Sequence, residues 1–155
     1  NQQFVKAVRK RKDEKVQRLI DIADCDFQDE DGYSALMYAS RDEHLNNIFM
    51  FLNHKVDVNL QNNKTGFTAL MYASKYNRNA AVVHMLLNHK ADVNLQSKRG
   101  SIALDFASRN KYLNIVKLLK YNHETQIREG FKMANKDGSI YVYDDIVNLI
   151  GDFTY

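Results

Sequence analysis

The sequence predicts an all-α solenoid, a row of stacked helical hairpins joined by turns and loops. A nine-residue stretch that begins with glycine occurs three times, at residues 32–40, 66–74 and 100–108, with successive glycines 34 residues apart. A second stretch, residues 53–61, returns as residues 88–96. Such self-similarity indicates stacked units, because one hairpin cannot bury its apolar face alone and each hairpin needs a neighbour.

Residues 1–28 are predicted to form a degenerate first repeat that caps the stack. The basic run at residues 9–12 marks the turn of a helical hairpin, because it separates two apolar stripes at helical spacing. These stripes are Phe4, Ala7 and Val8 before the run, and Val16, Leu19 and Ile20 after it. An end repeat needs a polar outer face, and this charged hairpin provides one.

Residues 29–61 and 62–96 are predicted to form the first and second full repeats. Ser34 and Thr68 are expected to cap the first helix of each repeat, since a hydroxyl oxygen accepts a backbone N–H at this position. Leu36 and Ala39 are expected to face inward on that helix in the first repeat. Its second helix is expected over residues 47–52, and its expected apolar contacts are Ile48, Phe49 and Leu52.

The second full repeat is expected to follow the same course with one residue more. Its second helix presents Val82, Val83, Leu86 and Leu87 as the inward apolar set. The distance from Gly66 to Asp92 is one residue longer than that from Gly32 to Asp57. We expect the extra residue in the turn at residues 76–80.

Residues 97–123 are predicted to form the third repeat, and residues 124–155 a degenerate closing hairpin. The third repeat keeps apolar residues at the helical positions, among them Leu104 and Ala107, but residues 121–125 lack the Asp-Val-Asn pattern of the earlier copies. The closing hairpin is expected to carry Ile127, Phe131 and Ala134 on its first helix and Gly138 in its turn.

The repeats resemble the ankyrin repeat family, whose unit is a β-turn followed by two antiparallel helices with a Thr-Pro-Leu-His-x-Ala signature. The resemblance covers residues 24–120 and implies stacked helix-turn-helix repeats joined by β-turn or hairpin loops. The segments that carry it are residues 34–39, 68–73 and 102–107 for the signature, and residues 55–59 and 90–94 for the family's Gly-Ala-Asp-Val-Asn loop.

The chain departs from the family pattern in three ways, each expected to weaken local order without altering the fold. Alanine replaces the first-turn proline in all three copies. Met37, Met71 and Asp105 replace the histidine, so the hydrogen bond that this histidine gives is expected to be missing. Lys55 and Lys90 stand where the family prefers a glycine that ends a helix in a left-handed conformation.

By resemblance, ankyrin domains bind partner proteins with their β-turn tips and the concave face of their first helices. In this chain the tips and helix ends change from acidic to basic along the stack, which predicts a groove for a protein segment of mixed charge. The partner is expected to be another protein or a domain of the same polypeptide. The predicted partner-binding residues are Glu30, Tyr33, Arg41, Asp42, Lys64, Phe67, Lys75, Tyr76, Lys98, Arg99, Arg109 and Asn110.

No catalytic, cofactor or metal motif accompanies the repeats, so the chain is predicted to be a non-catalytic interaction module without cofactor or metal. His54 and His89 recur at equivalent positions, but no further ligand pattern completes a site. Tyr38, Tyr72 and Phe106 also recur in register. The core is the favoured interpretation of these rings, and a stacking platform for bases, which would make the chain a binder of nucleotides or RNA, is the alternative.

Composition agrees with an intracellular domain. The single cysteine suits a reducing compartment, and no apolar run is long enough to cross a membrane. A net charge of +3 is too mild to require a nucleic-acid or membrane partner. The chain is expected to be monomeric and cytoplasmic, with the nucleus as the alternative if residues 9–12 act as an import signal. The first residue is Asn, so the chain is expected to be part of a longer protein. The alternative function is a targeting or autoinhibitory role within a larger multidomain enzyme.

Overall fold

The computed structural model describes residues 1–54 and 56–130, and the chain divides into two compact units, Asn1–Leu119 and Lys120–Tyr155. The first unit contains every feature on which the candidate site depends. The helices are α1 (Gln2–Arg9), α2 (Asp13–Leu19), α3 (Ala35–Arg41), α4 (Leu45–Leu52), α5 (Ala69–Tyr76), α6 (Ala80–Asn88), α7 (Ala103–Arg109) and α8 (Leu113–Gly130), and α8 runs from the first unit into the second.

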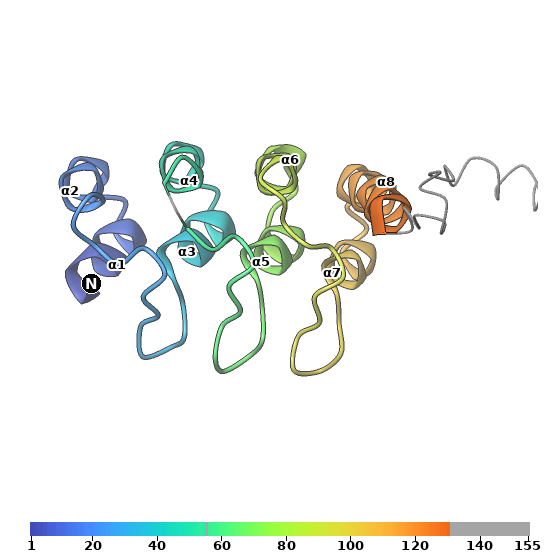
Figure 1. The fold of residues 1–155 in the computed structure, drawn as a ribbon, viewed down its shortest axis with the longest axis horizontal. Helices are drawn as coiled ribbons and strands as arrows, with labels where there is room; N and C mark the ends of the chain where they lie inside the picture. Colours follow the sequence, from blue (N-terminus) through green and yellow to red (C-terminus); the bar gives the residue numbers. More distant parts are fainter. Residues whose placement is uncertain (55, 131–155) are drawn as a thin grey trace, which may run out of the picture. The chain divides into compact units, whose positions relative to one another are not determined.

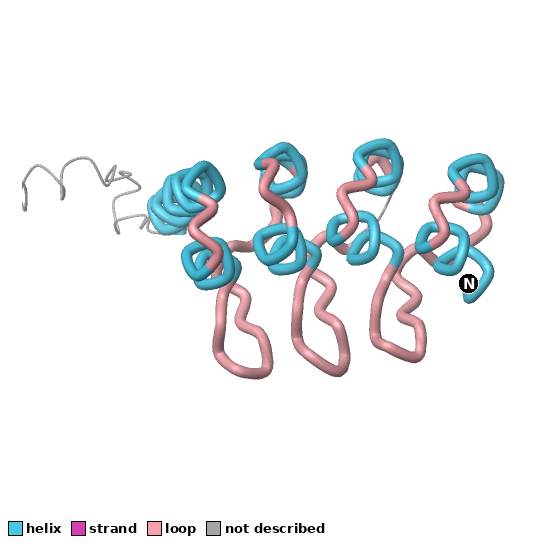
Figure 2. Tube along the Cα trace, turned by 180° about the vertical axis from the view of Figure 1, so that it is seen from behind, coloured by secondary structure: helices cyan, strands magenta, loops and turns pink. Residues whose placement is uncertain are grey.

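The first unit is a row of helical hairpins, which confirms the predicted all-α solenoid. The inner helices α1, α3, α5 and α7 lie side by side in one row, while α2, α4 and α6 form a second row, drawn above the first in Figure 1. Long loops precede α3, α5 and α7 and project together from one side of the rows, as the view from behind also shows (Figure 2). No residue in the described ranges forms a β-strand.

The turns between paired helices explain why the distance from Gly66 to Asp92 is one residue longer than that from Gly32 to Asp57. Arg11, Glu43 and Lys111 adopt positive φ angles of 53°, 58° and 57° in three of these turns. The turn after α5 is different, because Asn77 there is extended, with φ −103° and ψ 137°. α6 begins eleven residues after the start of α5, whereas α4 begins ten residues after the start of α3. The extra residue therefore lies where the sequence predicts it.

The helix caps agree with the prediction, with one correction. The hydroxyls of Ser34 and Thr68 accept the backbone N–H of the third helical residue, at 3.4 and 3.2 Å. The hydrogen bond expected to be lost with the family histidine is partly replaced, because Asp105 Oδ2 accepts the Ile102 N–H at 2.9 Å and Met37 Sδ accepts the Ser34 N–H at 3.5 Å. A carboxylate and a thioether can each accept this N–H, so the residues that replace the histidine restore part of the lost hydrogen bonding.

The core follows the predicted inward faces except on α4. Leu36, Ala39 and Leu70 are buried, and Leu104 is partly buried. Phe49, expected to be an apolar contact, is instead 63% exposed, whereas Phe51 is fully buried against Phe4, with ring centroids 5.7 Å apart. The prediction for Phe49 is wrong because α4 is apolar on more than one face, and its neighbours, among them α3, α6 and Phe4 of α1, decide which face is covered.

The end of the third repeat differs from the expectation. Helix α8 continues through residues 121–125 to Gly130, so the boundary expected between residues 123 and 124 falls inside one helix. No Gly or Pro interrupts these residues, and nothing there forces a turn. The remainder of the predicted closing hairpin, with Phe131, Ala134 and Gly138, lies outside the described residues.

One departure from the family pattern has the predicted backbone consequence. Lys90 follows α6 with φ 65°, a left-handed conformation that a glycine adopts without strain. The equivalent Lys55 lies outside the described residues.

Candidate binding surface

Three stacked loops carry the tips of the predicted surface: residues 29–33, 62–67 and 97–101. Each loop closes through a backbone hydrogen bond from its glycine to its first residue, at 2.9, 2.7 and 2.9 Å in chain order. Glutamines join neighbouring loops, because Gln28 Nε2 donates to Gln61 O and Gln61 Nε2 donates to Gln96 O, both at 2.8 Å. The tips are thus held at fixed positions relative to one another.

Gly66 and Gly100 offer a matched test of how closely the second and third loops approach. Both have positive φ angles, 73° and 76°, which cost a residue with a side chain about 1 kcal/mol. A Cβ on Gly66 would lie 2.7 Å from the Lys98 backbone nitrogen, whereas a Cβ on Gly100 would meet nothing within 4 Å.

We therefore expect Gly66→Ala to lower the free energy of unfolding by at least about 1 kcal/mol more than Gly100→Ala does. Urea denaturation followed by circular dichroism measures both variants. Equal losses would mean that the close approach of the two loops is not maintained in solution.

An aromatic ladder runs beneath the tips. The ring centroids of Tyr33 and Tyr38 lie 4.6 Å apart, those of Tyr33 and Tyr72 4.8 Å, and those of Phe67 and Tyr72 5.2 Å. The ladder ends with Phe67 and Phe106, 4.8 Å apart. Tyr38, Tyr72 and Phe106 are buried, at 2%, 2% and 8% exposure. This confirms that these three rings belong to the core.

The polar end of the ladder changes at the third repeat. Tyr38 Oη donates to Asp29 Oδ2 at 2.8 Å, and Tyr72 Oη accepts from Asn62 Nδ2 at 3.2 Å. Burial raises the pKa of the Tyr38 phenol, and the hydrogen bond to Asp29 raises it further. In the third repeat Ser97 and Phe106 stand at the equivalent positions, so this contact is missing there. Both replacements remove atoms that fill the same space in the earlier repeats.

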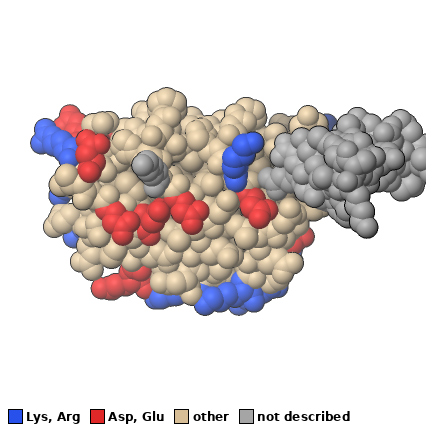
Figure 3. Space-filling view, in the orientation of Figure 1, with Lys and Arg blue, Asp and Glu red and all other residues tan. Residues whose placement is uncertain are grey.

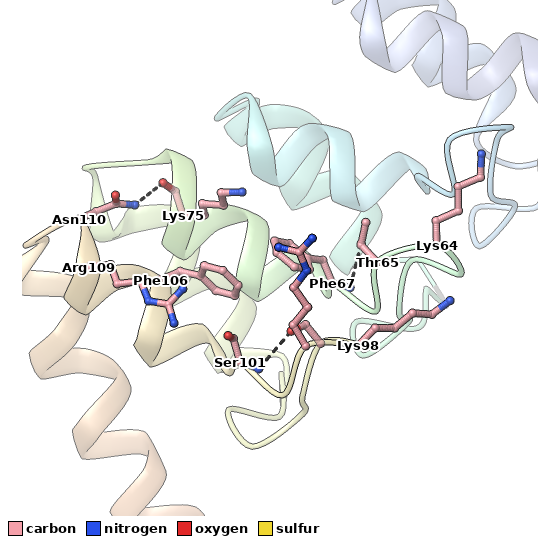
Figure 4. A pocket seen from close by; sticks show the side chains of 11 residues that line it. Lys64, Thr65, Phe67, Lys75, Lys98, Ser101, Phe106, Arg109 and Asn110 are labelled. Carbon is pink, nitrogen blue, oxygen red and sulfur yellow. Dashed lines mark hydrogen bonds between the residues drawn. The ribbon is translucent and has the colours of Figure 1, made fainter.

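A hollow of about 500 Å³ lies at this place. We call it the basic hollow. Figure 4 shows its side chains, which come from the second and third loops and from the ends of α5 and α7. Its lining residues are Lys64, Thr65, Phe67, Lys75, Ser97, Lys98, Arg99, Ser101, Phe106, Arg109 and Asn110.

Five of these lining residues are cationic and none is acidic. The Lys75 ammonium lies 5.3 Å from the centroid of Phe67 and 5.9 Å from that of Phe106, within cation–π range. Lys98 Nζ donates to Asn63 O at 2.6 Å. Across the described part of the chain, no carboxylate forms an ion pair with any of the five. Their positive charge is therefore not neutralised within this unit.

The basic hollow brings together seven of the twelve predicted partner-binding residues. Tyr76 lies next to it, half exposed, with the Lys75 ammonium 5.0 Å from its ring centroid. The seven are Lys64, Phe67, Lys75, Lys98, Arg99, Arg109 and Asn110.

The predicted residues of the first full repeat lie elsewhere, and Arg41 contacts both Asp42 and Tyr33. Arg41 forms a two-pronged ion pair with Asp42, at 2.6 and 3.0 Å, and its guanidinium lies 5.3 Å from the Tyr33 centroid. The hydrogen bonds from Arg41 lower the pKa of Asp42. Glu30 lines a separate hollow beside α1. Arg41 and Asp42 satisfy each other and have less charge to offer a partner.

Four lining residues were not among the twelve predicted partner-binding residues: Thr65, Ser97, Ser101 and Phe106. A signal for Thr65 was present, because Gly66 follows Asp57 by nine positions, whereas Gly100 follows Asp92 by eight. The second loop is therefore one residue longer than the third, and this longer loop contributes Lys64 and Thr65 to the hollow. Ser97 and Ser101 belong to the third tip in the sequence pattern as well, whereas Phe106 was expected to be a core residue.

The charge of the tips changes along the stack in the predicted direction. The first loop carries Asp29, Glu30 and Asp31, and the third carries Lys98 and Arg99. In the space-filling view, acidic atoms occupy the lower edge below the first loop, and basic atoms occupy the same edge below the next two (Figure 3).

The other candidate sites, a reactive thiol and a metal site, have less support from the structure, and so does a membrane-spanning helix. Burial raises the pKa of the Cys25 thiol, and nearby Asp26 and Asp24 raise it further, which disfavours the reactive thiolate. Within the described ranges, no three His, Cys, Asp or Glu side chains are grouped to hold a metal ion. None of the described helices is both long and apolar enough to cross a membrane.

The family comparison agrees with the architecture. A family model described as ankyrin repeats in three copies matches residues 4–97, and a second, described as ankyrin repeats in many copies, matches residues 76–119. A search of curated proteins found no match. Because the first model covers more than half of the chain and its repeats coincide with the stacked hairpins, this chain belongs to the ankyrin repeat family.

Proposed function

We propose that this chain is a non-catalytic binding module that holds an acidic segment of a partner protein in the basic hollow. Ankyrin repeats are generally protein–protein interaction modules. The partner is another protein or a domain of the same polypeptide. The observation that carries the proposal is the set of five cationic side chains lining one hollow without a carboxylate among the lining residues.

Physical reasoning supports an acidic protein segment as the occupant. Charges that line a concave surface raise the local potential and steer an oppositely charged partner during encounter. The fixed loops hold part of this charge in place, because Lys98 is hydrogen-bonded to the second loop and Lys75 lies over the rings. Side chains that are already ordered lose less conformational entropy when a partner binds.

Charge reversal at the third tip tests the proposal. We expect Lys98→Glu combined with Arg99→Glu to weaken binding of a glutamate-rich peptide about 10- to 100-fold, because both exposed cations line the hollow. Fluorescence anisotropy with a labelled peptide at low and physiological salt measures the affinity, and circular dichroism checks the fold. The matched control is Arg18→Glu with Lys117→Glu, which makes the same change in net charge at exposed positions outside the hollow.

Equal weakening in both double variants would show that the peptide responds only to net charge, and the proposal would then be wrong. If the hollow variant alone loses affinity, the same pair of variants serves for partner capture from cell extract with mass spectrometry. Proteins retained by the control variant and lost from the hollow variant are the candidate partners.

A further inference from the structure

We infer that the basic hollow selects a segment in which one aromatic residue lies between acidic residues, rather than an acidic segment of any composition. This inference rests on the proposed function and names the sequence class of the partner. It follows from how rings and cations are distributed within the hollow.

The centre of the hollow is aromatic. Phe67 and Phe106 lie side by side with centroids 4.8 Å apart, and the loss of a tyrosine hydroxyl and an Asn side chain at the third repeat leaves room beside them. Phe67 is only partly buried, whereas the ladder continues beyond it into the core. An aromatic side chain of a partner can pack against these rings, and such pairs contribute beyond their buried area.

The cations lie on both sides of this aromatic centre. In Figure 4, Arg109 of α7 lies on one side of the two rings, and Lys64 and Lys98 of the loops lie on the other. An extended segment across the hollow therefore meets a cation, then the rings, then cations again. Acidic residues before and after an aromatic residue match this order.

Lys75 links the two parts of the hollow. Its ammonium lies within 6 Å of the centroids of Phe67, Tyr76 and Phe106, and the side chain is half-buried. A carboxylate next to an aromatic anchor would meet this partly desolvated charge, where an ion pair is stronger than in water. A purely acidic segment would leave the rings without an apolar contact.

Three short peptides separate the contributions. The first has a central Phe with two Glu on each side, the second has Ser in place of Phe, and the third has Gln in place of every Glu. We expect the first to bind about tenfold tighter than the second, since aromatic anchors in pockets are the usual hot spots. We expect the third to bind at least tenfold more weakly than the first and with little salt dependence.

A charge-neutral variant tests the shape of the hollow. Ser97→Asn with Phe106→Tyr restores the pair of side chains that the second repeat has in Asn62 and Tyr72, and it should fill the space beside Phe67. This variant should lose the preference for Phe over Ser while still binding the Ser peptide. If circular dichroism shows that it does not fold, Phe67→Leu replaces it, because leucine stays apolar but removes the flat ring.

The outcomes distinguish this inference from the proposed function. Equal affinity for the Phe and Ser peptides would overturn the inference and leave acidic-segment binding intact. Absence of binding by either acidic peptide would overturn both. Tighter binding of a single-stranded oligouridine, with a steep loss of affinity as salt increases, would also overturn both in favour of a nucleic-acid site.

Discussion

Leu70→Asp is expected to abolish the cooperative unfolding transition of the stack. Leu70 is 1% exposed on α5, which contacts α3 on one side and α7 on the other. An isolated carboxylate at this position costs at least several kcal/mol, while the whole domain is stabilised by only about 5–15 kcal/mol. Because each repeat is stable only against its neighbours, damage in the middle separates the two ends. Thermal melting followed by circular dichroism measures the effect.

The control for this substitution is Leu113→Asp, which introduces the same charge at a position that is 69% exposed. We expect its free energy of unfolding to stay within about 0.5 kcal/mol of the original chain. Native-like melting of Leu70→Asp would contradict the stacking of α3, α5 and α7 described above.

Phe51→Ala is expected to lower the free energy of unfolding by about 3–5 kcal/mol. Phe51 is fully buried on α4 and contacts Phe4 of α1 edge to face, so its ring joins the capping hairpin to the first full repeat. Removal of the ring leaves a cavity at this junction. Urea denaturation gives the loss in stability, and the transition should become broader if the capping hairpin separates first.

Phe49→Ala on the same helix is the matched control, because Phe49 is 63% exposed and loses little contact. We expect it to change the free energy of unfolding by less than about 0.5 kcal/mol. Similar losses for the two variants, or a larger loss for Phe49→Ala, would support the inward face that the sequence suggested and contradict the structure.

The difference between Phe49 and Phe51 shows where sequence reasoning fails. Helix α4 is short and apolar around much of its circumference, so Leu52 with Ile48 and Phe49 fits one helical stripe and Ile48 with Phe51 fits another. A hydrophobic pattern identifies a buried face only when the opposite face is polar. The caps at Ser34 and Thr68 were predicted correctly, because a cap depends only on residues within one turn of the helix and not on distant packing.

The candidate site was predicted in part. The sequence identified all five cations of the basic hollow, because their positions repeat with the loops and helix ends. It also proposed Arg41 and Asp42, which pair with each other instead. That pairing depends on side-chain conformation, which no spacing reveals. Phe106 was assigned to the core alone, and Ser97 was considered only as a residue of the third tip. Their role in the hollow comes from the contact between Asn62 and Tyr72 that they do not reproduce.

The sequence by itself determined the repeating unit, its length, its caps and its loop glycines, because these depend on hydrogen bonds and apolar spacing within a few residues. Only the tertiary structure decided that the second and third loops enclose a hollow with rings at its centre and cations on both sides. The physical reason is that this hollow lies between repeats. Its shape depends on how the side chains of two neighbouring loops and helix ends pack against one another. No single segment of the sequence contains that information.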